Sequence, residues 1–208
     1  MPEMTSGRIT QVIAGATALA WLAVLLFGDA GVINHLAGFL PARATGLVPI
    51  DGGVPVWLTP LSATLLHAGL LHLGFNLVMF VYCGRAVETV IGGSAMLMLY
   101  LVGAYAAAAA HWLVDPASTV PMIGASGAIS AVIGAYAVFF SRSQVRAIGP
   151  FSPFVVRVVW LAAGWVFVQS LIGLAAIGAQ VAIAAHIGGF IAGLALARPL
   201  LLWRYRDA

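Results

Sequence analysis

Apolar stretches of about 20 residues recur along the chain, and almost no charge interrupts them. Of the 208 residues, 62% are hydrophobic and 7% are charged, whereas soluble domains carry about 25% charged residues. A helix of roughly 20 apolar residues can cross the ~30 Å hydrocarbon core of a bilayer. The sequence therefore predicts an all-α membrane protein in which 1–208 form one domain, with six transmembrane helices at about 9–28, 60–83, 91–113, 123–140, 154–173 and 179–197.

All nine basic residues are arginines, and their positions favour one orientation in the membrane. With the N-terminus in the cytoplasm, every arginine except Arg43 falls on the cytoplasmic side of the predicted helices, and Asp29, Asp51 and Asp115 fall in outer loops. Short cytoplasmic loops carry the excess of basic residues in membrane proteins. We therefore expect both termini in the cytoplasm. Our expectation for the location is a bacterial inner membrane. The basic balance then reflects topology, so we expect no nucleic-acid partner.

The first apolar stretch has a second interpretation, as a cleaved signal peptide, because Gly28, Asp29 and Ala30 loosely resemble a cleavage site. Its apolar run is longer than the 7–15 residues usual in signal peptides, and one arginine precedes it. The sequence therefore favours a retained transmembrane helix.

The polar residues inside the predicted helices are few, and such residues are functional candidates because they are costly in a bilayer. Ser126 lies near the outer end of the fourth helix and His186 near the outer end of the sixth. At 1.5 Å per residue, both are on the order of 10 Å below the outer surface. His72 and Asn76, somewhat deeper in the second helix, are four residues apart and share one face. Arg85 and Glu88 are expected to pair at the cytoplasmic end of that helix.

Small residues allow these helices to meet. The fourth helix offers Gly127, Ala131 and Gly134, and the sixth offers the pair Gly189 and Gly193. Such spacing lets helix backbones approach closely in membranes, although by itself it indicates only packing. Its occurrence beside polar residues at matching depth favours a functional site.

Nucleophilic acyl transfer is the chemistry that these residue types allow. Ser126 would attack a carbonyl, and His186 would take its proton as general base. His72, Asn76 and the Ser126 amide would stabilise the resulting oxyanion. No acidic residue lies near enough in the sequence pattern to orient His186, so the pair would be a dyad. A zinc protease is not expected, because no H-E-x-x-H motif occurs, and an aspartyl protease is not expected, because the aspartates outside the tail fall in loops. We expect no metal and no cofactor.

At these positions the sequence resembles the rhomboid family of intramembrane serine proteases. The matching segments are HAGLLHLGFN (67–76, continuing through Gly84 and Glu88), GASGA (124–128) and AHIGGFIAG (185–193). The resemblance implies that Ser126 is the nucleophile and His186 the general base. It assigns the oxyanion contacts to His72, Asn76 and the Ser126 amide.

The resemblance also implies supporting roles and partners. Gly124 precedes the nucleophile in the G-x-S-G motif, and His67 matches a histidine outside the dyad, for which we expect a structural or water-binding role. The implied fold is a helical bundle around a water-filled cavity that opens to the outer face. The implied partners are membrane lipids and single-pass membrane proteins, cut near small residues where a helix unwinds easily.

Two positions depart from the family pattern. Many members have a Trp-Arg pair in the first outer loop, whereas this chain has Trp57 without the arginine. Many also have an aromatic residue four positions after the nucleophile, packed against the catalytic histidine; this chain has Ser130. Neither departure removes an atom from the implied reaction.

Two other classes of protein remain as alternatives. One is a rhomboid-like pseudoprotease that binds transmembrane clients without cutting them, against which the Ser126 and His186 pair argues. The other is a small transporter, for which we would expect broken helices or charges at the midplane.

The arginine distribution generates a topology prediction. A reporter fused after Ala208 should be cytoplasmic, and one inserted near Asp115 should be external, because the basic residues hold their ends of the helices in the cytoplasm. Protease protection of the two reporters in spheroplasts measures this. An Asp115 reporter on the cytoplasmic side would contradict the orientation.

Overall fold

The protein is helical throughout the residues that the computed structural model describes, which are 7–49, 52–141, 145–175 and 182–206. Within these ranges there is no strand, and two isolated β-bridges join Phe39 to Met122 and Ile148 to Phe151. The helices are α1 (Arg8–Phe27), α2 (Ala30–Ala37), α3 (Pro41–Ala44), η1 (Val56–Leu58), α4 (Thr59–Ser62), η2 (Ala63–Leu65), α5 (Leu70–Ile91), α6 (Gly93–Val114), α7 (Ser126–Phe140), α8 (Pro153–Ala175) and α9 (Ile183–Arg204).

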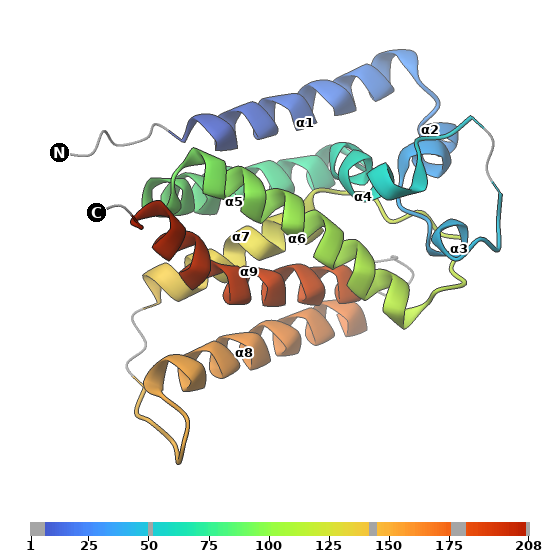
Figure 1. The fold of residues 1–208 in the computed structure, drawn as a ribbon. Coiled ribbons are helices and arrows are strands. Elements are labelled where there is room, and N and C mark those ends of the chain that lie inside the picture. The colour runs from blue at the N-terminus through green and yellow to red at the C-terminus, as the bar shows by residue number, and fades with distance from the viewer. Residues whose placement is uncertain (1–6, 50–51, 142–144, 176–181, 207–208) are drawn as a thin grey trace.

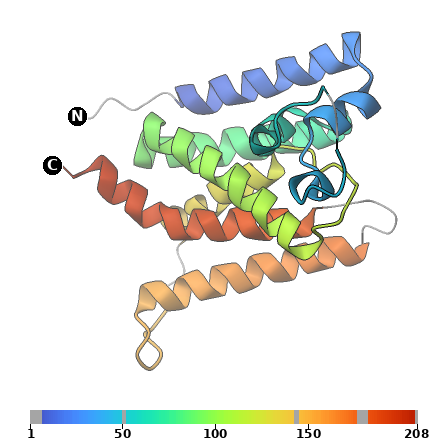
Figure 2. The same cartoon turned by 45° about the vertical axis from the view of Figure 1, so that its right-hand side comes forward.

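The long helices, α1 and α5 to α9, lie side by side and alternate in direction (Figure 1). The short helices α2, α3 and α4 gather at one end of the bundle, where α5, α7 and α9 begin. The start of α1 and the end of α9 lie at the opposite end. Figure 2 shows α1 and α8 on opposite outer sides, with the other long helices between them.

In the described parts of the chain, four helices are long and apolar enough to cross a membrane by length and composition: α1, α5, α6 and α9. The fourth predicted segment forms α7, which has 15 residues. At 1.5 Å per residue α7 is about 22 Å long, which is less than the thickness of a hydrocarbon core. Large apolar side chains are exposed along the outer helices, as on Leu19, Phe75 and Trp160. Apolar residues on the outside of a helical bundle are typical of surfaces that face lipid.

The predicted second helix is wrong at its start, because α5 begins at Leu70 rather than at residue 60. Residues 56–65 form three single turns instead, and extended Gly69 separates them from α5. The carbonyl of Ala63 accepts a hydrogen bond from the Gly124 amide (2.9 Å), and the Ser62 hydroxyl donates one to Ala37 O (2.6 Å). Partners outside the segment therefore hold it in turns, which hydropathy does not distinguish from a helix.

The loop between α1 and α5 is held to the bundle through its backbone at Trp57. The hydroxyl of Tyr105, on α6, donates a hydrogen bond to the carbonyl of Trp57 (2.8 Å), whose own side chain is 68% exposed. The loop therefore has an anchor in a chain that lacks the expected arginine beside Trp57.

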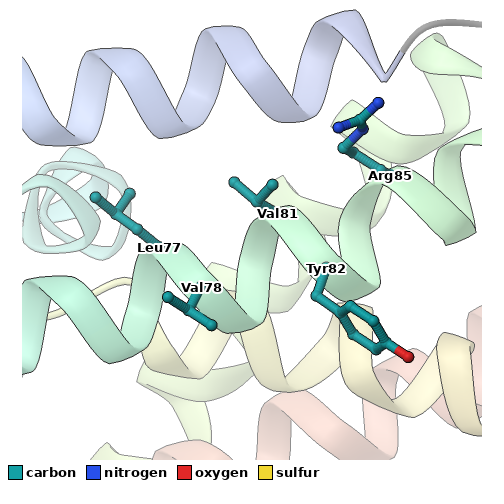
Figure 3. Close-up of a pocket in the computed structure, with 5 residues that line it drawn as sticks. All are labelled: Leu77, Val78, Val81, Tyr82 and Arg85. Carbon is teal, nitrogen blue, oxygen red and sulfur yellow. The ribbon is translucent and has the colours of Figure 1, made fainter.

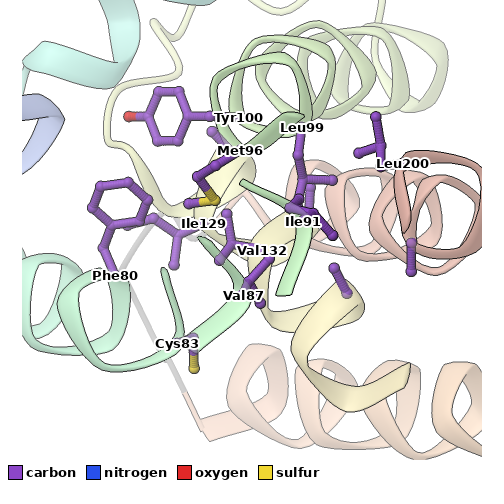
Figure 4. Packing of buried hydrophobic residues seen from close by; sticks show 14 of the residues in the cluster. Phe80, Cys83, Val87, Ile91, Met96, Leu99, Tyr100, Ile129, Val132 and Leu200 are labelled. Carbon is purple, nitrogen blue, oxygen red and sulfur yellow. The ribbon is translucent and has the colours of Figure 1, made fainter. Parts of the chain in front are cut away.

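The core lies where α5, α6, α7 and α9 meet, and α9 packs most extensively against α7 and α6. Figure 4 shows part of this core, in which Phe80 and Val87 of α5 face Met96 and Leu99 of α6 beside Val132 of α7. These five side chains are almost fully buried. The core therefore joins the helices that carry the polar residues singled out in the sequence.

Glycines bring α7 and α9 into backbone contact. A Cβ atom at Gly189 would collide with the Gly127 carbonyl, and one at Gly193 would collide with the Ala131 carbonyl. A Cβ atom at Gly134 would lie 2.5 Å from the Phe190 carbonyl. The small-residue faces predicted on these two helices therefore pack against each other.

A buried carboxylate joins α5 to the start of α1. Glu88 accepts hydrogen bonds from the Ile9 amide (3.0 Å) and from the amide and hydroxyl of Thr10 (2.9 and 2.7 Å). An acidic group is favourable here because the first amides of a helix lack partners within the helix and carry partial positive charge. The predicted Arg85–Glu88 pair is wrong, since the Arg85 side chain passes over Gly7 instead.

The contact between α7 and α9 predicts a large cost for added volume. Gly193→Ala should lower the free energy of unfolding by about 1–3 kcal/mol, because the new methyl group meets a backbone carbonyl that cannot rotate away. Denaturation in mixed micelles measures the change. Gly164→Ala in α8 is the matched control, because no atom lies within 4 Å of a Cβ built there. Equal stabilities for the two variants would contradict this account of the interface.

Candidate active site

Ser126 and His186 meet between two helices. Ser126 is the first residue of α7, and His186 lies in the first turn of α9. The His186 Nε2 atom and the Ser126 Oγ atom are 2.7 Å apart, which is an ordinary hydrogen-bond length. If Nε2 accepts a hydrogen bond from the Ser126 hydroxyl, the neutral imidazole carries its own ring hydrogen on Nδ1. Two residues that are 60 positions apart in sequence thus lie at the distance that a nucleophile and its general base would need.

His72 approaches the same point from α5. It lies in the first turn of that helix, which begins at Leu70. A Cβ atom at Gly124 would lie 2.8 Å from His72 Nε2 and 3.6 Å from Ser126 Oγ, so the side chains meet across this glycine. Gly124 also has φ +113°, a backbone conformation that other residues rarely adopt.

The His72 ring has a defined orientation. The Ala68 amide donates a long hydrogen bond to His72 Nδ1 (3.4 Å). Because Nδ1 is the acceptor, the neutral ring carries its hydrogen on Nε2, the atom beside Gly124. His72 is therefore oriented to donate a hydrogen bond next to the Ser126 hydroxyl.

Asn76 lies one turn after His72 and is buried. Its amide nitrogen donates a hydrogen bond to the His72 carbonyl (2.7 Å), which fixes the orientation of the side chain. An amide group has two hydrogens, so one such bond leaves the second for another acceptor.

His67 lies outside the Ser126–His186 pair. Its ring is 4.9 Å from the His72 ring, centroid to centroid, and the side chain is buried. Neither ring nitrogen makes a hydrogen bond of ordinary geometry to the described parts of the chain. His67 therefore packs behind the residue that faces the serine.

Ser130 is bonded along its own helix. Its hydroxyl donates to the Ser126 carbonyl one turn earlier (2.8 Å), which is a common arrangement for helical serines. Ser130 also lies at the contact with α9, because a Cβ atom built at Gly189 would be 3.3 Å from the Ser130 Cβ atom. It therefore supports packing, and no aromatic ring stands at this position.

Trp165 is a neighbour of the pair that the sequence reasoning missed. The indole Nε1 of Trp165, on α8, donates a hydrogen bond to the His186 carbonyl (3.3 Å), and its ring stacks on Phe190. Tryptophans of membrane helices concentrate at the interfaces, whereas Trp165 lies in the middle of α8. This unusual position was the signal in the sequence that could have marked Trp165 as a candidate.

A separate pocket of about 610 Å³ opens on the outer flank of α5 (Figure 3). It is lined by Leu77, Val78, Val81, Tyr82 and Arg85, and none of these is a predicted site residue. The pocket is therefore distinct from the meeting point of Ser126, His72 and His186.

In the described residues, no group of three or more His, Cys, Asp or Glu side chains is placed to hold a metal ion. A serine hydroxyl becomes nucleophilic when an adjacent base can take its proton.

The protein is a bundle of apolar helices with a serine and a histidine in contact between two of them. These two residues lie in motifs on which the resemblance to the rhomboid family rests. The chain belongs to the rhomboid family: residues 55–203 match the family model described as Rhomboid domain. The resemblance seen in the three sequence motifs is thereby confirmed. Family membership and the apolar helices make the chain an integral membrane protein.

Several curated relatives are named as rhomboid proteases. The chain is 28% identical over 193 residues to the rhomboid protease GlpG of Yersinia pestis (strain Pestoides F), which covers 92% of this chain and 62% of the relative. It is 32% identical over 196 residues to the rhomboid protease GlpG of Pectobacterium atrosepticum, and the match covers 94% of this chain and 63% of the relative. It is 31% identical over 147 residues to rhomboid-related protein 2 of Mus musculus, covering 65% and 45%. The chain thus spans less than two thirds of the length of these relatives.

The geometry of the pair predicts the reactivity of Ser126 toward a fluorophosphonate probe, which labels activated serines. Labelling should disappear in Ser126→Ala and fall by at least about 10²-fold in His186→Ala, because the base is lost. The rate should also fall in acid, because a protonated imidazole cannot accept the serine proton.

Ser130→Ala is the matched control, because its hydroxyl bonds to a backbone carbonyl and not to His186. Mass spectrometry of the labelled peptide identifies the modified residue. Labelling of His186→Ala at the wild-type rate would show that the 2.7 Å contact does not activate the serine.

Proposed function

We propose that the protein is an intramembrane serine protease that hydrolyses peptide bonds in or near the transmembrane segments of other membrane proteins. The observation that carries this proposal is the 2.7 Å contact between Ser126 Oγ and His186 Nε2. Family membership supports it, because relatives of this chain are named as proteases.

In the proposed reaction, His186 takes the Ser126 proton while Oγ attacks the carbonyl carbon of the scissile bond. The imidazolium then gives the proton to the leaving amine, and an acyl-enzyme on Ser126 remains. A water molecule, deprotonated by His186, attacks the ester carbonyl. The carboxylic acid leaves and Ser126 regains its proton, so the enzyme returns to its starting state.

The oxyanion of each tetrahedral intermediate would be held by hydrogen-bond donors at the meeting of α5 and α7. Three features support this assignment: the Nε2–H orientation of His72, the second amide hydrogen of Asn76, and the Ser126 amide at the start of α7. The first amides of a helix also carry partial positive charge, which favours a developing negative charge. Gly124 would leave space for the substrate carbonyl beside His72.

The proposed orientation puts this site toward the outer face of a bacterial inner membrane, with both termini in the cytoplasm and six crossings. The arginine distribution supports it. The alternating directions of α1 and α5 to α9 support it as well (Figure 1). The proposed substrates are single-pass proteins whose helices unwind readily at small residues.

Proteolysis of a model single-pass substrate in proteoliposomes tests the proposal. The wild type should cut it, and Asn76→Ala and His72→Ala should each slow cleavage by roughly 10²-fold, because each removes an oxyanion donor. The double variant should lose less than the product of the two factors if both donors serve one oxyanion. Asn34→Ala, at the only other asparagine, is the matched control and should cut at the wild-type rate.

A folded wild type that binds the substrate but leaves it uncut would contradict the protease proposal and favour the pseudoprotease. Cleavage at the wild-type rate by both Asn76→Ala and His72→Ala would contradict the oxyanion assignment alone.

A further inference from the structure

The turn of α9 that carries His186 is contacted by a side chain of α8, the helix on the outside of the bundle next to α9. Figure 2 shows α8 running alongside α9 on the side opposite α1. Among the described helices, α8 packs most extensively against α9. Its largest contact is therefore with the helix that carries His186, while Arg157 of α8 also donates a hydrogen bond to the Val138 carbonyl of α7 (3.1 Å).

Within that contact, Trp165 of α8 meets the turn of α9 that carries His186. Its Nε1–H donates to the His186 carbonyl at 3.3 Å. Its ring lies 4.8 Å from the Phe190 ring, centroid to centroid, with 8° between the ring planes. His186 and Phe190 are one helical turn apart, so the indole spans the turn of α9 that carries the imidazole.

The first turn of a helix has fewer hydrogen bonds than the turns after it, because its first four amides have no partner within the helix. His186 lies at the end of this turn of α9, and its amide donates a long hydrogen bond to the Ala182 carbonyl (3.2 Å). The residue of α7 one turn after the nucleophile, Ser130, bonds to its own helix and offers no ring surface to His186. Trp165 supplies an aromatic contact and a hydrogen bond to the same turn from the other side.

We propose that Trp165 is a positioning residue, which holds the first turn of α9 so that His186 stays within hydrogen-bond distance of Ser126. This inference rests on the proposed function, since it assigns a role in the same reaction. It also makes the reaction depend on the α8–α9 contact: separating α8 from α9 removes the support of the general base.

The size of the effect follows from the bond that is removed. A neutral hydrogen bond contributes about 0.5–1.5 kcal/mol net, which corresponds to a roughly two- to tenfold change in rate if it is lost in the transition state. Loss of the stacked ring as well should produce a larger decrease. Substrate affinity should not change, because Trp165 acts on His186 and not on the substrate.

Two substitutions separate the hydrogen bond from the stacking. Trp165→Phe keeps an aromatic face against Phe190 but removes the N–H group, and Trp165→Leu removes both. Trp203→Phe is the matched control, because Trp203 is on the same helix as His186 but near its far end. The measurements are kcat and KM for a model single-pass substrate, the rate and end point of fluorophosphonate labelling, and the melting temperature in detergent.

We expect Trp165→Phe to lower kcat and the labelling rate together by about two- to tenfold, with KM, the labelling end point and the melting temperature as in Trp203→Phe. Trp165→Leu should lower kcat further. An unchanged kcat in Trp165→Phe, a change in KM alone, or a reduced labelling end point at an unchanged rate would each overturn the inference. The last result would mean fewer folded molecules rather than a displaced base.

A readout that does not need activity separates this inference from the proposed function. The carbon NMR signal of the His186 ring, assigned with His186→Ala, should shift in Trp165→Phe and not in Trp203→Phe. If the wild type neither labels nor cuts, the proposed function fails, and the NMR comparison still decides whether Trp165 positions His186. An identical His186 signal in both variants would overturn the positioning role.

Discussion

The separation between the backbones of α7 and α9 governs the candidate site. Gly189 lies against the Gly127 carbonyl and Gly193 against the Ala131 carbonyl, so the two helices approach as closely as backbone atoms allow. Lipid chains are as apolar as leucine side chains, so helices in a membrane associate through close packing rather than through the hydrophobic effect. A serine and a histidine have short side chains. They reach 2.7 Å only because their helices are this close.

The site also gathers three helix beginnings at one end of the bundle. His72, Ser126 and His186 each lie in the first turn of a long helix. Side chains in a first turn point toward the end of the helix, and the adjoining amides are unpaired. This arrangement puts polar groups near the end of the bundle while the remaining turns of the same helices stay apolar. One set of helices can thus form an apolar core and a reactive site.

Much of this arrangement could be predicted from the sequence because it depends on local signals. Ser126 and His186 stand beside glycines within apolar runs, and helical spacing alone puts His72 and Asn76 on one face. The start of α5 was not predicted, because residues 60–69 carry no charged residue and run directly into the apolar helix. Their turns depend on partners distant in the sequence, such as the Gly124 amide that bonds to Ala63 O.

The contacts of Glu88 and Trp165 were missed for a related reason. Glu88 bonds to the backbone amide of Ile9 and to the amide and hydroxyl of Thr10, and backbone amides carry no signal in a sequence. The Trp165 bond ends on the His186 carbonyl and depends on how far α8 is shifted along α9. A sequence therefore indicates which side chains are unusual for their surroundings more readily than it indicates which backbone atoms they meet.

The Glu88 contact has a consequence for the order of events during synthesis. Domains of a growing chain emerge from the N-terminal end at about 5–20 residues per second, so α1 enters the membrane several seconds before Glu88 is translated. Of the side chains in α1, only Thr10 and Thr17 are buried, so this helix needs little from the rest of the bundle to reside in lipid. Its first amides cannot bond to the Glu88 carboxylate until the end of α5 has been made. Attachment of α1 is therefore a late assembly step, separate in time from its insertion.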